Sequence, residues 1–277
     1  MNKTKILILS LLLCVFTSAA AQEYSWKAVE MNGSRTGCTT PDKDNVTEAA
    51  GYVKGGKYHA PNGKVFKAGS STAKTAAVVI DAQPAMARVK EVIGYSPVAM
   101  SARRPQSGLS NMAIDVIMNK VDQLVDEKVH MGVTNFGGIR VDMPEGNILL
   151  DDMLSMFPFR NYLVYVEHKG STIRKMLEHQ AAGRFHVLGG VRLVVEDGKL
   201  VSAELGGEPL DDNKTYGIAT ISFLLDGGDG LALRQDAVKM IEFPEVDIID
   251  AVLEYVYAET AAGRPIVYNT DDRIVIR

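Results

Sequence analysis

Cysteine is almost missing from this sequence of 277 residues. One of its two cysteines, Cys14, lies in an N-terminal apolar run that we expect to be removed, so only Cys38 remains. A single cysteine cannot form a disulfide within the chain, and stability must therefore come from packing. We interpret Cys38 as a small apolar filler rather than as a catalytic nucleophile.

The sequence also lacks the patterns that usually hold transition metals. None of its histidines stands in a His-x-His or His-Glu-x-x-His pair. There is no Gly-x-Ser-x-Gly elbow and no P-loop. We therefore expect no metal site built by this chain alone and no serine nucleophile. The five histidines are His59, His130, His168, His179 and His186.

Long apolar runs are absent after the first residues. Residues 1–21 combine two lysines, an apolar run and an Ala-x-Ala site ending at Ala21, which predicts a secretory signal peptide. The residues before Cys14 are not the small ones that a lipid-attached cysteine usually needs, which favours a soluble exported protein over a lipoprotein. No later segment is long and apolar enough to span a bilayer. We expect a periplasmic or cell-surface location.

An excess of positive charge is also missing. Removing 21 of 277 residues leaves 256, with 28 basic and 34 acidic side chains and a net charge of −6. This balance disfavours nucleic acid or an anionic membrane surface as the partner. A small anionic ligand stays open, because a few arginines can hold a phosphate.

The chain divides near residue 80. Residues 22–80 alternate short apolar pieces with Asn-Gly and Gly-Gly turns, which predicts an irregular, β-rich N-terminal extension. From residue 81 the spacing of apolar residues changes to three and four. This change predicts helices over 81–94 and 108–127, with Asp81 or Ser110 as a cap.

Strands and helices mix after residue 128. The predicted strands are 128–135, 161–170, 215–222 and 273–277, with a hairpin over 190–205 that turns at Asp197–Gly198. Predicted helices cover 171–183 and 246–263. Because the elements do not alternate strictly as βαβ units, residues 81–277 are expected to form one α+β domain or a mixed layered sandwich.

Three stretches with glycines or aromatic residues remain unexplained by composition: "NFGGIR" at 135–140, "FPFRN" at 157–161 and "FLLDGGDG" at 223–230. Each alone could be an ordinary turn, and the phenylalanines could be core residues. Together they fit a nucleotide. A Gly-Gly turn lets backbone amides approach an anion, and Arg140 offers a planar guanidinium for phosphate oxygens. Phenylalanines can stack on a base, and Asp229 can accept hydrogen bonds from the hydroxyls of a sugar.

The order and spacing of these stretches resemble the C-terminal domain of the 5'-nucleotidases, a family that includes periplasmic UDP-sugar hydrolases and animal ecto-nucleotidases. The resemblance covers about residues 98–277 and includes "YLVYVEHKGSTIRKMLEH". It implies a layered α/β/β/α sandwich that binds the nucleoside. In that family a separate N-terminal metallophosphatase domain carries two metal ions and performs hydrolysis.

Matched residue by residue, the resemblance implies roles for several side chains. Phe159 and Phe223 would sandwich the base, Asn135 would hydrogen-bond it, Asp229 would hold the ribose hydroxyls and Arg140 would contact phosphate.

Four glycines would shape the turns: Gly137, Gly138, Gly227 and Gly228. Arg104 is also carried over as substrate-binding, although the arginine register before the following helix differs from the family pattern by one residue.

The family's metal-binding motifs, Asp-x-His, Gly-Asn-His-Asp/Glu and His-x-His, occur nowhere in the sequence. We therefore predict the nucleotide-binding half of a split exported 5'-nucleotidase, inactive alone. No catalytic residue or cofactor is expected in this chain, and divalent metals are expected only in a separate metallophosphatase polypeptide.

Two alternatives stay open. The chain could be a non-catalytic periplasmic nucleotide- or nucleoside-binding protein or scaffold. It could also keep the fold while its aromatic residues are buried in a repurposed core. The preferred base, the number of phosphates and the oligomeric state are not predicted.

Overall fold

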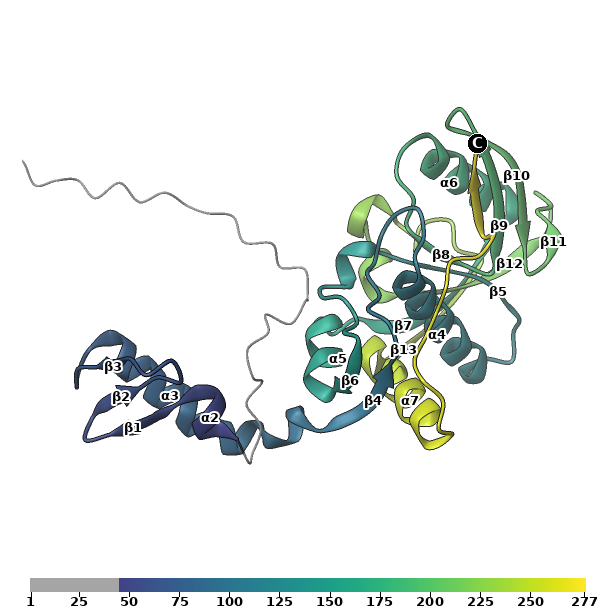
Figure 1. Ribbon diagram of the computed structural model, residues 1–277. Coiled ribbons are helices and arrows are strands. Elements are labelled where there is room, and N and C mark those ends of the chain that lie inside the picture. The colour runs from purple at the N-terminus through teal and green to yellow at the C-terminus, as the bar shows by residue number, and fades with distance from the viewer. Residues whose placement is uncertain (1–44) are drawn as a thin grey trace, which may run out of the picture. The chain divides into compact units, whose positions relative to one another are not determined.

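The structure is a computed structural model that describes residues 45–277 (Figure 1). The predicted signal peptide, Cys38 and residues 22–44 of the predicted extension lie outside these residues. The first described segment contains a three-stranded antiparallel sheet in the order β1-β2-β3. Its elements are α2 (Val46–Ala50), β1 (Tyr52–Lys54), β2 (Lys57–His59), β3 (Val65–Phe66) and α3 (Ser71–Met86).

Helix α3 corrects the prediction for residues 81–94. The helix begins at Ser71, where the side chain of Ser70 accepts a hydrogen bond from the backbone N–H of Ala73. A 3-10 turn (Ala87–Lys90) and strand β4 (Val92–Ser96) occupy the rest of the predicted helix. Alanines at 73, 76, 77, 82 and 85 favour this helix, because alanine has the highest helix propensity.

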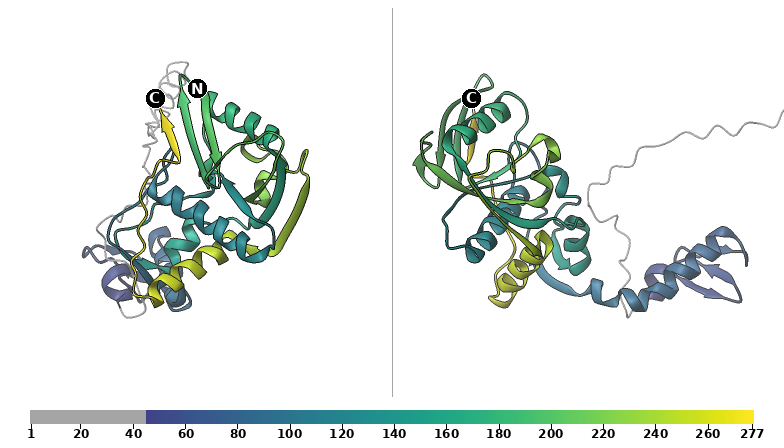
Figure 2. Two further views of the ribbon diagram at one scale, coloured as in Figure 1. Left: turned by 90° about the vertical axis from the view of Figure 1, so that its right-hand side faces the viewer. Right: turned by 180° about the vertical axis from the view of Figure 1, so that it is seen from behind.

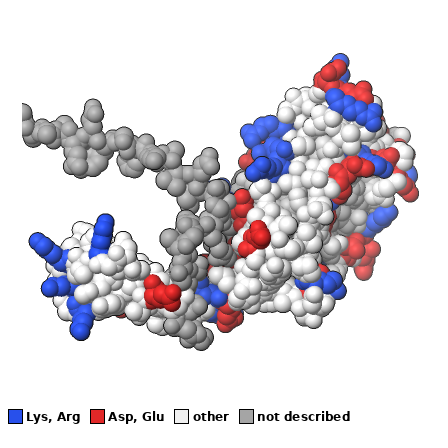
Figure 3. Space-filling view, in the orientation of Figure 1, with Lys and Arg blue, Asp and Glu red and all other residues white. Residues whose placement is uncertain are grey.

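Lysines are prominent on this small segment (Figure 3). Lys54 and Lys57 flank the turn between β1 and β2, and Lys64 and Lys67 flank β3; all four are exposed. Charged side chains at the margins of a short sheet hinder pairing with another sheet edge.

The larger part of the fold is built on a five-stranded mixed sheet in the order β13-β7-β12-β5-β8. Strand β12 runs parallel to β5 and antiparallel to β7. The strands are β5 (Val129–Thr134), β7 (Tyr162–Lys169), β8 (Val187–Gly189), β12 (Thr215–Ile221) and β13 (Lys239–Asp247). The middle strands are buried almost throughout, as expected for a sheet covered on both faces.

A second sheet has the order β11-β10-β9-β14. Its C-terminal strand β14 runs parallel to β9, and the two lie side by side in Figures 1 and 2. The predicted hairpin is confirmed, because β9 and β10 pair across a turn in which Asp197 and Gly198 have φ of 48° and 71°. The strands are β9 (Val191–Glu196), β10 (Lys199–Leu205), β11 (Glu208–Pro209) and β14 (Ile274–Ile276).

Helices and a short two-stranded sheet complete the core. Helix α6 lies against β10 and β7, and helix α7 packs on β4 and α4. Strand β4 pairs with β6. These elements are α4 (Gly108–Leu124), β6 (Gly146–Leu149), α5 (Leu150–Met156), α6 (Gly170–Ala182) and α7 (Ile248–Ala261). Mixed sheets with packed helices confirm the predicted α+β class.

Helix α4 is the central helix, and its packing depends on a glycine in β5. Its cap is Ser107, which forms a reciprocal capping box with Ser110. A Cβ added to Gly132 would lie 2.6 Å from Met118 Cγ and 2.7 Å from Ile114 Cδ1. The helix therefore approaches the sheet more closely than any residue with a side chain would allow.

Replacing this glycine is expected to destabilise the domain. Gly132→Ala should lower the free energy of unfolding by about 1–3 kcal/mol, because the methyl group overpacks a closed interface. Chemical denaturation measures the change. The control is Gly183→Ala, where φ is −132° and the nearest atom would be 3.4 Å away. Equal stability of the two variants would contradict the close approach.

Candidate functional site

The topology brings the three sequence motifs to one edge of the five-stranded sheet. Because β5 and β12 are parallel, the segments that follow them, Asn135–Arg140 and Ser222–Gly230, leave at the same edge. Strand β7 is antiparallel to β12, so Phe159, just before β7, lies there too. We call this group of residues, Asn135–Arg140, Phe159 and Phe223–Asp229, the motif edge.

A hydrogen bond joins two of the motifs directly. Asn135 Nδ2 donates to Asp229 Oδ2 over 2.8 Å. A Cβ on Gly137 would lie 3.3 Å from Asn135 Nδ2 and 3.7 Å from Asp229 Oδ2, so the Gly-Gly turn passes close to this pair. Asn135 is 6% exposed, and its Oδ1 has no hydrogen-bond partner among the described residues.

Backbone conformation fixes the position of Asp229. The residue has φ of 48° in the short 3-10 turn Gly228–Gly230, a left-handed conformation that aspartate tolerates better than most side chains. Its neighbour Gly228 has no room for a side chain, since a Cβ would lie 2.1 Å from Phe223 O and 2.8 Å from the Phe223 ring. The turn thereby sets Phe223 and Asp229 side by side.

Two of the three aromatic rings of the motif edge are open to solvent, and the third, Phe136, is buried. Phe159 is 46% exposed and Phe223 is 44% exposed, whereas Phe157 is buried. Among the ring contacts of residues 45–277, none joins Phe159 to Phe223. The alternative that both rings are buried in a repurposed core is therefore wrong.

Two arginines stand beside these groups. The guanidinium carbon of Arg140 lies 5.8 Å from the centre of the Phe159 ring, and its Nη1 donates to Gly137 O. Arg104 lies over the ring of Phe136 at 4.4 Å, and its Nε donates to Phe185 O. Neither guanidinium forms an ion pair with a carboxylate among the described residues.

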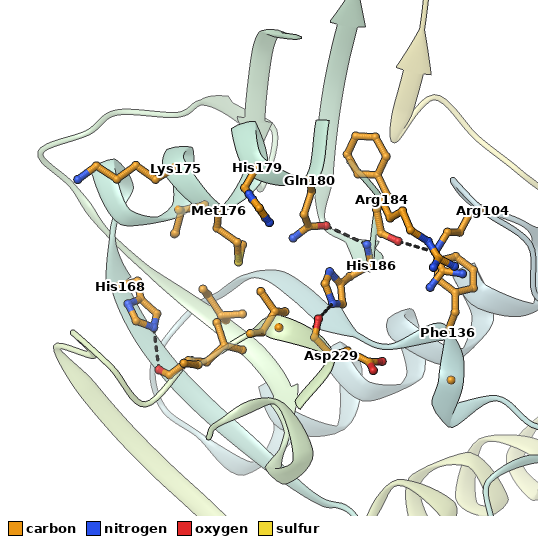
Figure 4. Close-up of a pocket in the computed structure, with 18 of the residues that line it drawn as sticks. Arg104, Phe136, His168, Lys175, Met176, His179, Gln180, Arg184, His186 and Asp229 are labelled. Carbon is orange, nitrogen blue, oxygen red and sulfur yellow. Dashed lines mark hydrogen bonds between the residues drawn. The ribbon is translucent and has the colours of Figure 1, made fainter. Parts of the chain in front are cut away.

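A cavity of about 990 Å³ adjoins the motif edge (Figure 4). Gly137, Arg140, Asp229 and Arg104 all line it. Burial and the nearby charge of Arg184 lower the pKa of Arg104, while Asp229 opposes this effect. A smaller hollow is lined by Asn135, Gly138 and Phe159.

Several residues that line the two hollows were not predicted from the sequence. Asn161 lines the smaller hollow and stood in the quoted "FPFRN" stretch without being assigned a role. One face of helix α6 lines the large cavity. Residues three and four apart lie on one face of a helix, so this spacing in the sequence could have identified the lining residues. The lining residues from α6 are Thr172, Ile173, Lys175, Met176, His179 and Gln180.

Other kinds of site are less well supported. Within residues 45–277, no group of three or more His, Cys, Asp or Glu side chains is placed to hold a metal ion. No helix in the described part of the chain has the length and apolar character needed to cross a membrane.

Curated proteins are similar to a part of this chain. It is 35% identical over 113 residues to Protein UshA of Salmonella pullorum, which covers 39% of this chain and 20% of that protein. It is 29% identical over 173 residues to the 5'-nucleotidase of Bos taurus, covering 53% of this chain and 30% of the relative. The chain thus matches less than a third of the length of either protein.

A solved structure agrees with the fold. The 5'-nucleotidase precursor from Thermus thermophilus superimposes with a TM-score of 0.63 at 25% identity, covering 74% of this chain and 43% of that one. The family model for the 5'-nucleotidase C-terminal domain matches residues 82–236. The chain therefore belongs to the 5'-nucleotidase C-terminal domain family.

Proposed function

We propose that this domain binds nucleotides or nucleosides at the motif edge, as the binding component of an exported 5'-nucleotidase. One observation carries the proposal: an amide and a carboxylate, Asn135 and Asp229, are bonded beside a Gly-Gly turn with two exposed rings and an unpaired arginine around them. Base, sugar and phosphate each find a matching group in this set.

The geometry supports a role for each side chain. Phe159 and Phe223 offer stacking faces for a base. Oδ1 of buried Asn135 has no partner among the described residues and can accept a hydrogen bond from the edge of the base. Asp229 keeps Oδ1 for ribose hydroxyls, since Oδ2 is used by Asn135. Arg140 is suited to phosphate, because among the described residues its guanidinium contacts only neutral groups, Gly137 O and the Phe159 ring.

Arg104 is the second candidate for phosphate. It lines the same cavity as Arg140 and Asp229, and its stacking on Phe136 holds the guanidinium in place. Gly227 and Gly228 act indirectly, by allowing the turn that presents Asp229.

In this proposal the catalytic half acts in trans. Hydrolysis in a two-metal phosphatase needs metal ions that clamp the attacking and leaving oxygens. The 277 residues contain none of the motifs that would hold them. We propose that a separate metallophosphatase polypeptide supplies the metals, in the periplasm or at the cell surface.

The chain alone is expected to be inactive. Purified protein supplied with Mg²⁺, Mn²⁺ or Zn²⁺ should release phosphate from AMP no faster than buffer containing the same metal. Phosphate release measures this directly. Hydrolysis at an ordinary enzymatic rate by the isolated chain would overturn the division into two polypeptides, while leaving nucleotide binding in place.

A mixing experiment separates the split enzyme from a stand-alone binder. Addition of the chain to an exported metallophosphatase that lacks this domain should raise AMP hydrolysis, and Phe223→Ala should remove the increase. Nucleotide binding without any activation of such a polypeptide would favour the non-catalytic binding protein.

A further inference from the structure

Arg184 is a cationic side chain of the large cavity to which the proposed function gives no role. It follows helix α6, in the loop before β8, and lines the cavity together with Arg104 from the segment before α4. Figure 4 draws Arg184 and Arg104 at one end of the cavity, beside Phe136, and Lys175 at the opposite end. We call Arg104 and Arg184 the arginine pair.

Two contacts hold Arg104 next to Arg184. Nε of Arg104 donates to Phe185 O over 3.0 Å, so the guanidinium is bonded to the residue that follows Arg184. The carbon of the same guanidinium lies 4.4 Å from the centre of the Phe136 ring. Burial is the largest cause that lowers the pKa of Arg104, and the charge of Arg184 is the second, so the two cations are near enough to repel each other.

The arginine pair has donors available for a ligand. Both side chains are exposed. Arg184 has no hydrogen bond or ion pair among the described residues, and Arg104 uses only Nε, which leaves its two Nη groups. A guanidinium presents its N–H groups in a planar fork that matches the oxygens of a phosphoryl group. The pair is therefore suited to an oxyanion, which would also relieve the repulsion between the two charges.

The charge of the cavity favours more than one anionic group. Among the described residues, the cationic side chains that line it are Arg104, Arg140, Lys175 and Arg184, and the only carboxylate is Asp229, which leaves a local charge of +3. The whole sequence has the opposite balance, with a net charge of −4. A phosphate monoester carries about −1.5 to −2 near pH 7, so one phosphate leaves part of the positive charge unmatched.

The volume of the cavity points the same way. In the proposed binding mode the base stacks on Phe159 and Phe223, and neither ring lines the large cavity. The cavity of about 990 Å³ is therefore left to the ribose and the phosphoryl groups. Pockets of about 300–1,000 Å³ hold whole drug-sized ligands, so this volume exceeds what a ribose and one phosphate need.

We propose that the arginine pair forms a second phosphoryl subsite, separate from the phosphate contact of Arg140. The ligand class is a nucleotide that carries two phosphoryl groups, and Arg184 is the residue that favours it over a monophosphate. This inference rests on the proposed function for the positions of the base and ribose. The same two guanidiniums would also hold free phosphate beside a bound monophosphate, and the test separates these two sources.

The test titrates the full chain with AMP, ADP and adenosine 3',5'-bisphosphate, followed by calorimetry. ADP or the bisphosphate should bind at least about tenfold more tightly than AMP, the gain expected for one hydrogen-bonded contact between charged groups. The two compounds distinguish a second group on the 5' chain from one on the ribose. Inorganic phosphate is titrated with AMP present; binding that Arg184→Met weakens would support the subsite with free phosphate as its occupant.

Variants test the role of Arg184 directly. Arg184→Met should lower the ratio of the affinity for the preferred two-phosphoryl nucleotide to that for AMP by about tenfold. Arg184→Lys keeps the charge without the planar fork and should restore part of this ratio. Lys175→Met is the matched control, because it removes one positive charge from the opposite end of the same cavity, and it should leave the ratio within about twofold. Unfolding curves check that each variant is folded.

Three results would overturn the inference while the proposed function stands. One is equal affinity for AMP and both two-phosphoryl nucleotides, with no phosphate bound beside AMP. Another is an equal loss for AMP and these nucleotides in Arg184→Met, which would mean that a single phosphate contacts the arginine pair. A third is a ratio that Lys175→Met lowers as much as Arg184→Met does, which would indicate general electrostatic attraction in place of a subsite. Failure of every nucleotide to bind, AMP included, would remove the proposed function and this inference together.

Discussion

Replacing Phe223 with alanine is expected to weaken AMP binding by roughly 5- to 150-fold, which corresponds to the 1–3 kcal/mol of one base–aromatic stacking contact. Stability should change little, by about 1 kcal/mol or less, because the ring is 44% exposed and already in contact with water. Phe159→Ala should act in the same direction. Calorimetric titration and chemical denaturation of the same preparations measure both quantities.

A matched control comes from helix α7. Tyr257 is 47% exposed, similar to Phe223, and lies on α7, outside the motif edge. Tyr257→Ala should leave AMP affinity unchanged. If Phe223→Ala instead cost about 3–5 kcal/mol of stability, as loss of a core ring does, and left affinity intact, the ring would be structural.

Replacing Arg273 with methionine is expected to cause the largest loss of stability. Its guanidinium donates to both carboxylate oxygens of Asp115 on α4 at 3.1 Å, and to Asp271 and to Leu188 O. Burial opposes the charge on Arg273, but the hydrogen bonds to Asp271 and Asp115 outweigh it and raise its pKa. Burial raises the pKa of Asp115, so this carboxylate depends on its partner.

Without Arg273, Asp115 is left partly buried and unpaired. The free energy of unfolding should fall by about 3 kcal/mol, the lower end for a broken buried pair. The lower end applies because the Asp115 side chain is 27% exposed in the folded protein. Arg192→Met removes an exposed pair with Asp272 and should cost about 1 kcal/mol or less. Denaturation curves in which the two variants unfold alike would contradict a structural role for the buried pair.

Much of the fold follows from periodicity and turn chemistry. Strands β5, β7 and β12 and helices α4, α6 and α7 lie where alternation, helical spacing and glycine stops predict them. The proximity of the three motifs could not be derived from the residues alone. It depends on the parallel pairing of β12 with β5, two strands about 80 residues apart, and the sequence suggested it only through the shared fit to a nucleotide and the family resemblance.

The missed elements have local reasons. Strand β13 contains Pro244 where its pairing with β7 shifts register. Proline within an apolar run usually indicates the end of a strand, so β13 was not predicted. Ser70 was not recognised as a cap because the alanine-rich helix after it lacks an apolar stripe.

The central claim is that a nucleotide binds at the motif edge, with its base against the exposed rings and its phosphate at Arg140. Calorimetric titration of the full chain with AMP, followed by adenosine, tests it most directly. We predict one site with measurable heat, weaker binding for adenosine because Arg140 loses its phosphate, and a large reduction in Phe223→Ala. A folded protein that gives no heat with either compound at millimolar concentration would contradict the account.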